Sequence, residues 1–452
     1  MWLNFIFLKT DIRFKHIHTL AVPALIAGIA EPLLSITDTA IIGNIDTNAV
    51  ESLAAVGIVG AFVSMLVWVF GQIRSAISSI ISQYVGANAL DEVRDLPAQA
   101  TGIVLLGSLI VLAISYPFAS TIFEFYNASG LVLVYAVKYF EIRIFGFPFS
   151  LFVFAIFGTF RGLQNTFYPM MIAIVGALLN VVLDVAFVYG IDGIIAPMHI
   201  EGAAYASVIS QIAMALFAAI LLLKKTSISL KIQLPFNKEI NRLLGMISNL
   251  FIRTIALNIA LYFGTSYAAA YGKEYMAAYT IGLNIWFLAA FMIDGYSSAG
   301  NILSGKLLGA KAYSSLIQLG NTLTKYGFFM GVFLAVVGFT FYETIGTIFT
   351  KETAVLKPFY DTFWIILAMQ PLCAITFIFD GIYKGMGEMR ILRNLLVVST
   401  GLVFIPVLIL FDALNYQLHA IWIAFTFWII VRGFPLIILF RRKFIPLAEK
   451  KS

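Results

Sequence analysis

Charged residues are scarce in this sequence. They make up 12% of its 452 residues, whereas apolar residues make up 61% and the mean hydropathy is +0.95. A soluble domain carries about 25% charged residues. Because so few charges cannot cover a surface that faces water, most of the exterior must face lipid. The composition therefore predicts an integral membrane protein.

Residues that hold metals or nucleotides are also few. The single cysteine, Cys373, lies in an apolar run, which excludes an intrachain disulfide and a cysteine-based metal site. The four histidines stand near the ends of apolar runs, and the chain has neither a GxxxxGK[ST] loop nor a DDxxD pattern. These gaps argue against an ATP-driven pump and against a prenyltransferase-like membrane enzyme. We expect no enzymatic activity and no cofactor other than a coupling ion.

The net charge of +6 does not indicate a nucleic-acid partner, because the Lys and Arg residues lie in short loops between apolar runs. In such loops they act as topology signals or contact anionic lipid headgroups. The N-terminus shows no convincing cleavable signal peptide. We therefore expect membrane lipid, and not nucleic acid, as a partner.

Twelve segments are apolar and about 20 or more residues long, enough to cross a bilayer as helices. They are residues 17–44, 53–83, 100–122, 131–157, 167–190, 202–224, 241–268, 276–305, 322–347, 358–383, 391–413 and 416–440. With both termini inside, about twenty Lys and Arg fall in inside segments and three or four outside. The sequence thus predicts an all-α membrane protein with twelve spans and cytoplasmic termini.

An internal repeat divides the chain. Three short segments of the first half each match a segment of the second half, and the two members of every pair are separated by the same number of residues, which we call the repeat offset. The pairs are 84–89 with 307–312, 53–55 with 276–278, and 161–163 with 384–386. Six spans per half is an even number, which predicts parallel repeats related by an axis along the membrane normal. We predict an N-terminal lobe over 1–224, a cytoplasmic linker over 225–240 and a C-terminal lobe over 241–452. Substrate would bind in a central cleft, and the lobes would rock to expose it alternately.

Ionisable residues within the first span point to a transport pathway, because a charge at the bilayer centre costs about 2.5–3.5 kcal/mol. Glu31 and Asp38 are seven residues apart, and so lie on nearly one helical face. Pro23 lies upstream and removes a backbone donor, which can bend the helix. A bent helix with a carboxylate beyond the bend predicts a moving gate. The alternative is that both carboxylates accept structural hydrogen bonds.

The fifth span carries Asn180 and Asp184 at i,i+4 spacing, on one helical face. If this face meets Asp38, three oxygen-bearing side chains converge, and Ser207 of the sixth span adds a hydroxyl. Two close carboxylates favour the uptake of a proton or a cation. We predict a coupling-ion site at Asp38, Asn180, Asp184 and Ser207, holding a proton or, at Asp38, Asn180 and Asp184, sodium. The alternative is an Asn–Asp hydrogen bond that only joins helices.

The second half places different charges at depth. In the second repeat, Leu261 occupies the position that corresponds to Asp38, and Val407 occupies the position that corresponds to Asp184. The second half has Arg253, Asp294 and Asp380 instead, which are further candidates for residues of the cavity together with Glu31. One Arg could neutralise one Asp and leave the other for a proton or a cationic substrate. The alternative is a plain ion pair, since buried charges are generally paired.

These residues resemble the multidrug and toxic compound extrusion (MATE) family, in its DinF-like branch. The resemblance covers nearly the whole chain and rests on four segments and two residue pairs: Pro23 with 35–40, 161–166, 180–184 and 202–207, and the pairs Asp294-Gly295 and Asp380-Gly381. It implies two six-helix lobes and export of organic cations or amphipathic compounds, driven by a proton or sodium gradient. It also implies that Asp38, Asn180, Asp184 and Ser207 form the coupling-ion site. Two departures are Arg253-Thr254, where NorM-like members have an acidic residue, and Ser207, where Thr is common.

We therefore expect a monomeric, cation-coupled antiporter in a bacterial inner membrane. A flippase for lipid or lipid-linked precursors is the alternative, and it would need a cationic cavity, for which Arg253 and Lys306 are the candidates.

Overall fold

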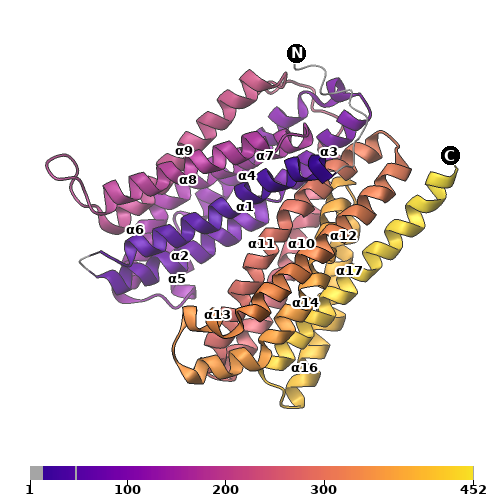
Figure 1. Cartoon of the computed structure of the whole chain (residues 1–452). Coiled ribbons are helices and arrows are strands. Elements are labelled where there is room, and N and C mark those ends of the chain that lie inside the picture. The colour runs from indigo at the N-terminus through magenta and orange to yellow at the C-terminus, as the bar shows by residue number, and fades with distance from the viewer. Residues whose placement is uncertain (1–13, 46–47, 451–452) are drawn as a thin grey trace. The chain divides into compact units, whose positions relative to one another are not determined.

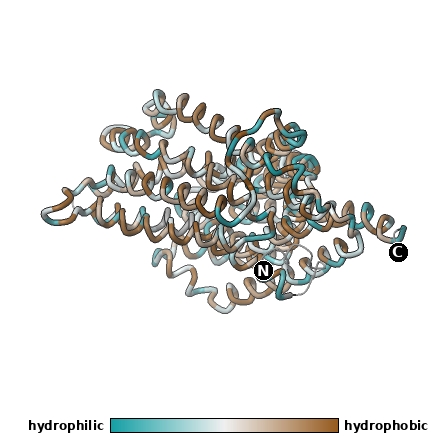
Figure 2. The backbone as a smooth tube through the Cα atoms, turned by 90° about the horizontal axis from the view of Figure 1, so that it is seen from above, coloured by the Kyte–Doolittle hydropathy of each residue, from teal (hydrophilic) through white to brown (hydrophobic). Residues whose placement is uncertain are grey.

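The computed structural model describes residues 14–45 and 48–450, without the side chains of Phe14 and of residues 30–36. Eleven helical segments in this part of the chain are long and apolar enough to cross a membrane. α1 (Phe14–Ile42), with 29 residues, adds a helix of spanning length. Hydrophobic residues dominate the helices, and hydrophilic residues gather at the loops (Figure 2). The predicted all-α fold class is confirmed.

Contacts divide the chain into two compact units. Unit 1 comprises the chain up to Leu25, residues 82–88 and residues 245–452, and unit 2 comprises residues 26–81 and 89–244. The chain thus passes between the units inside α1, two residues after Pro23. The predicted lobes follow the repeat in the sequence, whereas these units follow contacts in space.

Unit 2 is built around pairs of neighbouring helices. Its helices, besides the second part of α1, are α2 (Ala49–Phe70), most of α3 (Ile73–Gly86), α4 (Leu96–Ser115), α5 (Ala119–Phe125), α6 (Gly130–Arg143), α7 (Phe147–Gly162), α8 (Phe167–Val188) and α9 (His199–Lys225). α8 packs along α9, α4 along α7, and α2 along α6. A Cβ on Gly202 would lie 2.6 Å from the carbonyl oxygen of Phe187, so α8 and α9 meet backbone to backbone at this point.

Unit 1 has α14 (Thr353–Gly385) at its centre. The other helices are α10 (Ile240–Ala270), α11 (Lys273–Gly309), α12 (Tyr313–Thr340), α13 (Tyr342–Phe349), α15 (Met389–Ser399), α16 (Ile405–Ala413) and α17 (Leu418–Glu449) (Figure 1). α14 packs against α11, α12 and α17. A Cβ on Gly381 would lie 2.1 Å from the carbonyl oxygen of Ser297, so only glycine permits this approach of α14 to α11. Small residues bring backbones together in membrane helices in this way.

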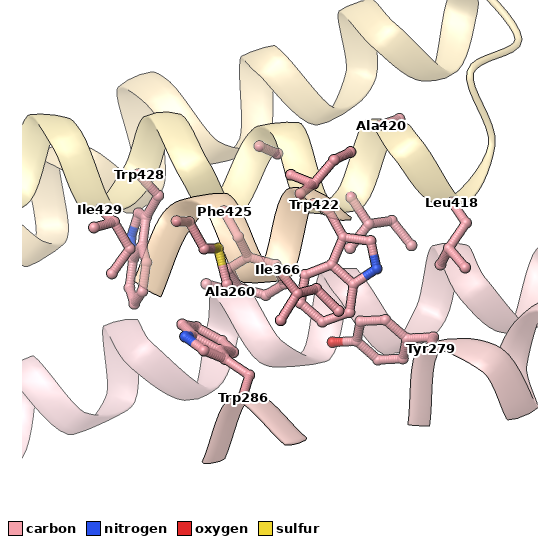
Figure 3. Close-up of a cluster of buried hydrophobic side chains, with 14 of the residues drawn as sticks. Ala260, Tyr279, Trp286, Ile366, Leu418, Ala420, Trp422, Phe425, Trp428 and Ile429 are labelled. Atoms are coloured by element: carbon pink, nitrogen blue, oxygen red, sulfur yellow. The ribbon is translucent and has the colours of Figure 1, made fainter. Parts of the chain in front are cut away.

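Aromatic side chains fill one core of unit 1. Trp422 and Phe425 of α17 and Trp286 of α11 are buried together, and the Trp286 and Phe425 ring centroids are 5.1 Å apart (Figure 3). The completely buried Cys373 of α14 belongs to the same core. The indole Nε1 of Trp286 donates a hydrogen bond to Sγ of Cys373 at 3.4 Å. The single thiol is therefore a packed core group.

The helix bounds reproduce the repeat. α5 begins at Ala119 and α13 at Tyr342, and α6 begins at Gly130 and α14 at Thr353. Likewise α7 ends at Gly162 and α14 at Gly385, and α3 ends at Gly86 and α11 at Gly309. Each of these pairs is separated by the repeat offset found in the sequence.

Several predicted spans differ from the helices in detail. The predicted spans 53–83, 131–157 and 391–413 each contain a break: at Gly71, at the 3-10 turn Ile144–Gly146 and at the π-helical turn Thr400–Phe404. Pro148 and Pro406 follow the last two breaks, and proline offers no backbone donor to the preceding turn. The predicted spans 100–122 and 322–347 ran past the ends of α4 and α12 into the short helices α5 and α13.

The segment between α9 and α10 belongs to unit 2 and packs against the start of α4. The side chain of Gln99, in α4, donates to the carbonyl oxygen of Gln233 at 2.7 Å and accepts from the backbone N–H of Asn237 at 2.8 Å. The Asn237 amide donates to the Asp95 carboxylate at 2.8 Å, and Lys238 pairs with Glu92 at 2.5 Å. Hydrogen bonds and an ion pair therefore hold the segment that connects the two repeats against the start of α4.

Candidate functional site

The candidate site in unit 2 is assembled by three helices with buried polar positions. Asn180 and Asp184 continue the buried stripe of α8, whose members recur every three or four residues. Ser207 lies on the face of α9 made of small residues, among Ala203, Ala204 and Ala206. Small side chains let α9 approach α8 closely, which brings the Ser207 hydroxyl near the stripe. Asp38 reaches the site from the last turns of α1.

Two carboxyl groups face each other in this site. The carboxyl group of Asp38 lies near the carboxyl group of Asp184 and near the Ser207 hydroxyl. Asp38 is 8% exposed and Asp184 is fully buried. Among the described residues, both oxygens of Asp184 and Oδ1 of Asp38 have no donor. Ionised carboxylates only accept hydrogen bonds, so a proton or a cation between them would satisfy the pair.

A cationic side chain stands beside the pair. Arg143, the last residue of α6, lies close enough to interact electrostatically with both Asp38 and Asp184. Its guanidinium lies near the phenol of Tyr139, one turn back on α6, and its Nη1 donates to Oε1 of Gln211 at 3.0 Å. The break after α6 is needed for this arrangement. A Cβ on Gly146 would lie 1.8 Å from Oε1 of Gln211.

The structure places Asp38, Asp184 and Ser207 near one another. Asn180 is 3% exposed, one turn from Asp184, and its Nδ2 has no partner among the described residues. Pro23 lies half-buried in α1, which runs as one helix from Phe14 to Ile42, so a bend at this proline stays a prediction. The side chain of Glu31 falls outside the described residues.

Unit 1 holds a buried ion cluster in place of a carboxyl pair. Nη2 of Arg253, on α10, donates to Oδ2 of Asp380 on α14 at 2.6 Å. Arg432 of α17 donates to the same Oδ2. All three residues are buried. The ion-pair interpretation therefore fits Asp380 better than a free carboxylate does.

The surroundings hold Arg432 in place. Its guanidinium carbon lies 5.1 Å from the centroid of the Trp428 ring and 5.4 Å from that of Phe377, which places the cation over two aromatic faces. The Trp428 indole donates to the Thr400 hydroxyl at 3.0 Å, at the π-helical turn. Asp294 lies half-buried on α11, and no described ion pair includes it.

Sequence reasoning missed four residues of these two clusters. Tyr139, Arg143 and Gln211 complete the site in unit 2, and Arg432 completes the cluster in unit 1. Arg143 lies inside the predicted span 131–157 and Arg432 inside 416–440. The same rule that singled out Arg253, a charge within an apolar run, would have found both arginines.

Comparisons with known proteins agree with this architecture. The family model MatE matches residues 23–186 and 250–410. DNA damage-inducible protein F of Escherichia coli is 25% identical over 433 residues, which cover 95% of this chain and 92% of that protein. Multidrug export protein MepA of Staphylococcus aureus is 22% identical over 420 residues, 90% of this chain and 89% of that protein.

Solved structures show the same fold. A crystal structure of MATE in the bent conformation has a TM-score of 0.89 at 20% identity, and covers 96% of both chains. The MATE transporter VcmN of Vibrio cholerae, in its bent form, has a TM-score of 0.87 at 18% identity, covering 96% of this chain and 98% of that one. The resemblance seen in the sequence is thereby confirmed. Because the family model matches both repeats, this chain belongs to the MatE family, in its DinF-like branch.

Proposed function

We propose that this protein is a secondary active multidrug exporter that exchanges organic cations or amphipathic compounds for protons by alternating access. It would reside as a monomer in a bacterial inner membrane, with both termini in the cytoplasm. The observation that carries the proposal is the buried carboxyl pair of Asp38 and Asp184. The names of relatives such as MepA support multidrug export.

The charges at the pair favour one proton over sodium. Two ionised carboxylates beside the Arg143 cation leave one net negative charge, and one proton shared by the carboxyls removes it. A sodium ion would balance the same charge, but it would have to sit near the Arg143 guanidinium. Arg143 opposes the uptake of either cation, but a proton bonds to one carboxyl oxygen and needs no shell of further ligands. We therefore infer proton coupling, with one proton for each transport cycle.

Proton uptake would bias the conformation through α1. Without a proton, Asp38 and Asp184 repel each other, and with one proton they form a hydrogen bond. The pair thus gains attraction between α1 and α8 only when it is protonated. An ion can shift a conformational equilibrium when the two states bind it unequally. One charge moving through the membrane supplies about 2.3 kcal/mol per 100 mV, enough for a modest concentration gradient of substrate.

Transport in proteoliposomes tests this proposal. Wild-type protein should export a fluorescent organic cation under a pH gradient, and not under a sodium gradient alone. Asp38→Asn and Asp184→Asn should each lose more than about 90% of the coupled flux. Asp192→Asn, in the exposed loop between α8 and α9, is the control for loss of an acidic residue and should retain the flux. Unchanged flux in both site variants would show that Asp38 and Asp184 are not the coupling site. Flux driven by a sodium gradient alone would identify sodium, and not the proton, as the coupling ion.

A flippase for anionic lipid precursors is less favoured. It needs free cationic groups in the substrate cavity, and Arg253, one of the two candidates beside Lys306, is engaged by Asp380. Lipid scrambling without export of the organic cation in the same liposomes would favour this alternative.

A further inference from the structure

A pocket at one end of unit 1 combines apolar walls with basic residues. It has a volume of about 290 Å³ and lies where the end of α14, the start of α15 and the last turns of α17 meet. Its lining is Tyr383, Met386, Glu388, Ile391, Leu439, Arg442, Lys443 and Phe444. Nothing in the proposed transport site involves these residues.

The floor of the pocket is rigid and apolar. Tyr383, Met386 and Phe444 are each buried to at least 95%. The Tyr383 hydroxyl donates to the carbonyl oxygen of Leu436 at 3.0 Å, and the Phe444 ring packs against that of Phe440 with centroids 5.2 Å apart. Leu439, in contrast, is 41% exposed. The apolar surface thus continues outward from the pocket along α17.

The rim of the pocket carries an excess of positive charge. Lys443 pairs with Glu388 at 2.6 Å, whereas no described ion pair or hydrogen bond engages the side chain of the exposed Arg442. The stretches 384–393 and 439–450 together hold seven Lys and Arg against two Glu. This is the end of the protein that the positive-inside rule assigns to the cytoplasm.

The length of α17 places the rim of the pocket at the membrane surface. α17 has 32 residues and so measures about 48 Å, well beyond the roughly 30 Å of a hydrocarbon core. Its last turns mix the exposed apolar side chains Leu439 and Ile445 with Arg441, Arg442 and Lys443, and α17 is the last helix of the chain, ending at Glu449 (Figure 1). A helix end of this composition suits the boundary between headgroups and acyl chains.

We propose that this pocket binds one anionic phospholipid of the cytoplasmic leaflet. Its phosphate would lie between Arg442 and Lys443, and an acyl chain would follow Leu439 and Ile391. An amphiphile matches both halves of the lining, whereas a soluble anion would leave the apolar walls uncovered. Glu388 competes with the phosphate for Lys443, so the Glu388–Lys443 pair sets the affinity for the lipid. The inference does not depend on which compound the protein transports or on the coupling ion.

Thermal unfolding of the full-length protein in detergent micelles tests the site. Phosphatidylglycerol should raise the midpoint by about 2 °C or more over an equal amount of phosphatidylcholine, because a ligand that binds only the folded state stabilises it. The double variant Arg442→Gln/Lys443→Gln should lose at least about three quarters of this difference. Arg441→Gln is the matched control, since the exposed Arg441 is a neighbour on α17 that does not line the pocket. It should keep the difference.

A second variant, expected to strengthen lipid binding, distinguishes loss of the site from misfolding of the double variant. Glu388→Gln frees Lys443, and so should lower the phosphatidylglycerol concentration that gives half the shift by about twofold or more. Retained lipid, counted by native mass spectrometry, should follow the same order among the variants. Equal effects of the two lipids, an equal loss in Arg441→Gln, or the same shift with soluble glycerol phosphate would each overturn the proposal.

Discussion

At the repeat offset, unit 1 has Leu261, Val407 and Ile366 where unit 2 has Asp38, Asp184 and Arg143. The reverse comparison gives the same result. Asp380 and Arg432 of unit 1 correspond to Phe157 and Ile209 of unit 2. The helix bounds nevertheless coincide. The repeated scaffold therefore accommodates apolar residues at every one of these positions.

The two charged clusters also differ in their balance of donors and acceptors. In unit 2, two carboxyl groups face each other, and three of their oxygens lack a donor among the described residues. In unit 1, two guanidinium groups converge on one oxygen of Asp380. The first arrangement gains a hydrogen bond when a proton arrives, whereas the second is held together only while Asp380 stays ionised. We therefore propose a switching role for the carboxyl pair of unit 2 and a fixed structural role for the ion cluster of unit 1.

Replacing the acid of each cluster should separate these roles. Asp380→Asn leaves two buried guanidinium groups without a countercharge, and should cost about 3–5 kcal/mol of unfolding free energy. Asp184→Asn removes a carboxylate that has no donor among the described residues, and should change stability by less than about 1 kcal/mol. Unfolding midpoints of the purified variants measure both effects. A larger loss for Asp184→Asn than for Asp380→Asn would reverse the assignment.

Replacing all three charged residues of the unit 1 cluster should restore much of the stability that Asp380→Asn alone removes. The triple variant Arg253→Met/Asp380→Leu/Arg432→Met keeps the side-chain volume and leaves no charge of this cluster unpaired. We expect its unfolding free energy to recover at least about 2 kcal/mol relative to Asp380→Asn. Coupled transport should persist in it if the cluster is structural. A stable triple variant without transport would show that these charges serve the transport cycle.

Gly146→Ala should disturb the unit 2 site without touching a charge. The new methyl group would displace Gln211, the partner of Arg143, at a cost of about 1–3 kcal/mol from overpacking. Gly107→Ala is the control, since a Cβ at that position of α4 meets nothing within 4 Å. It should be neutral or stabilise by up to about 1 kcal/mol, because alanine favours a helix over glycine. Equal unfolding midpoints for the two variants would contradict the crowding argument.

The smallest effect is expected at the hydroxyl beside the carboxyl pair. Ser207→Ala removes the hydroxyl beside Asp38, whose interaction with the carboxyl group we expect to be worth about 0.5–1.5 kcal/mol, so coupled flux should fall about two- to tenfold. Ser210→Ala, nearly one turn further along α9, removes a buried hydroxyl that has no partner among the described residues, and should leave the flux unchanged. The proteoliposome assay distinguishes them. A loss confined to Ser210→Ala would place the site elsewhere on α9.

The sequence predicted the scaffold well because hydrophobic length and the repeat offset are long-range patterns. The i,i+4 spacing of Asn180 and Asp184 placed them on one face of α8, whereas the approach of Asp38 to that face was a hypothesis. The sequence did not predict Arg143 at the site. That position depends on the break at Ile144–Gly146, where Gly146 leaves room for Gln211. Spacing fixes the face of a helix, but the direction in which a broken helix resumes depends on neighbours distant in the sequence.

The burial of Cys373 has a practical consequence for measuring motion. Its sulfur is enclosed by the aromatic core of unit 1 and receives a hydrogen bond from Trp286, so aqueous thiol reagents have no access to it in the folded protein. Cysteines introduced at exposed positions can therefore carry spin labels or fluorophores without removal of the native thiol. One label in each unit would then follow the transport cycle as a change in distance, in a protein otherwise unaltered.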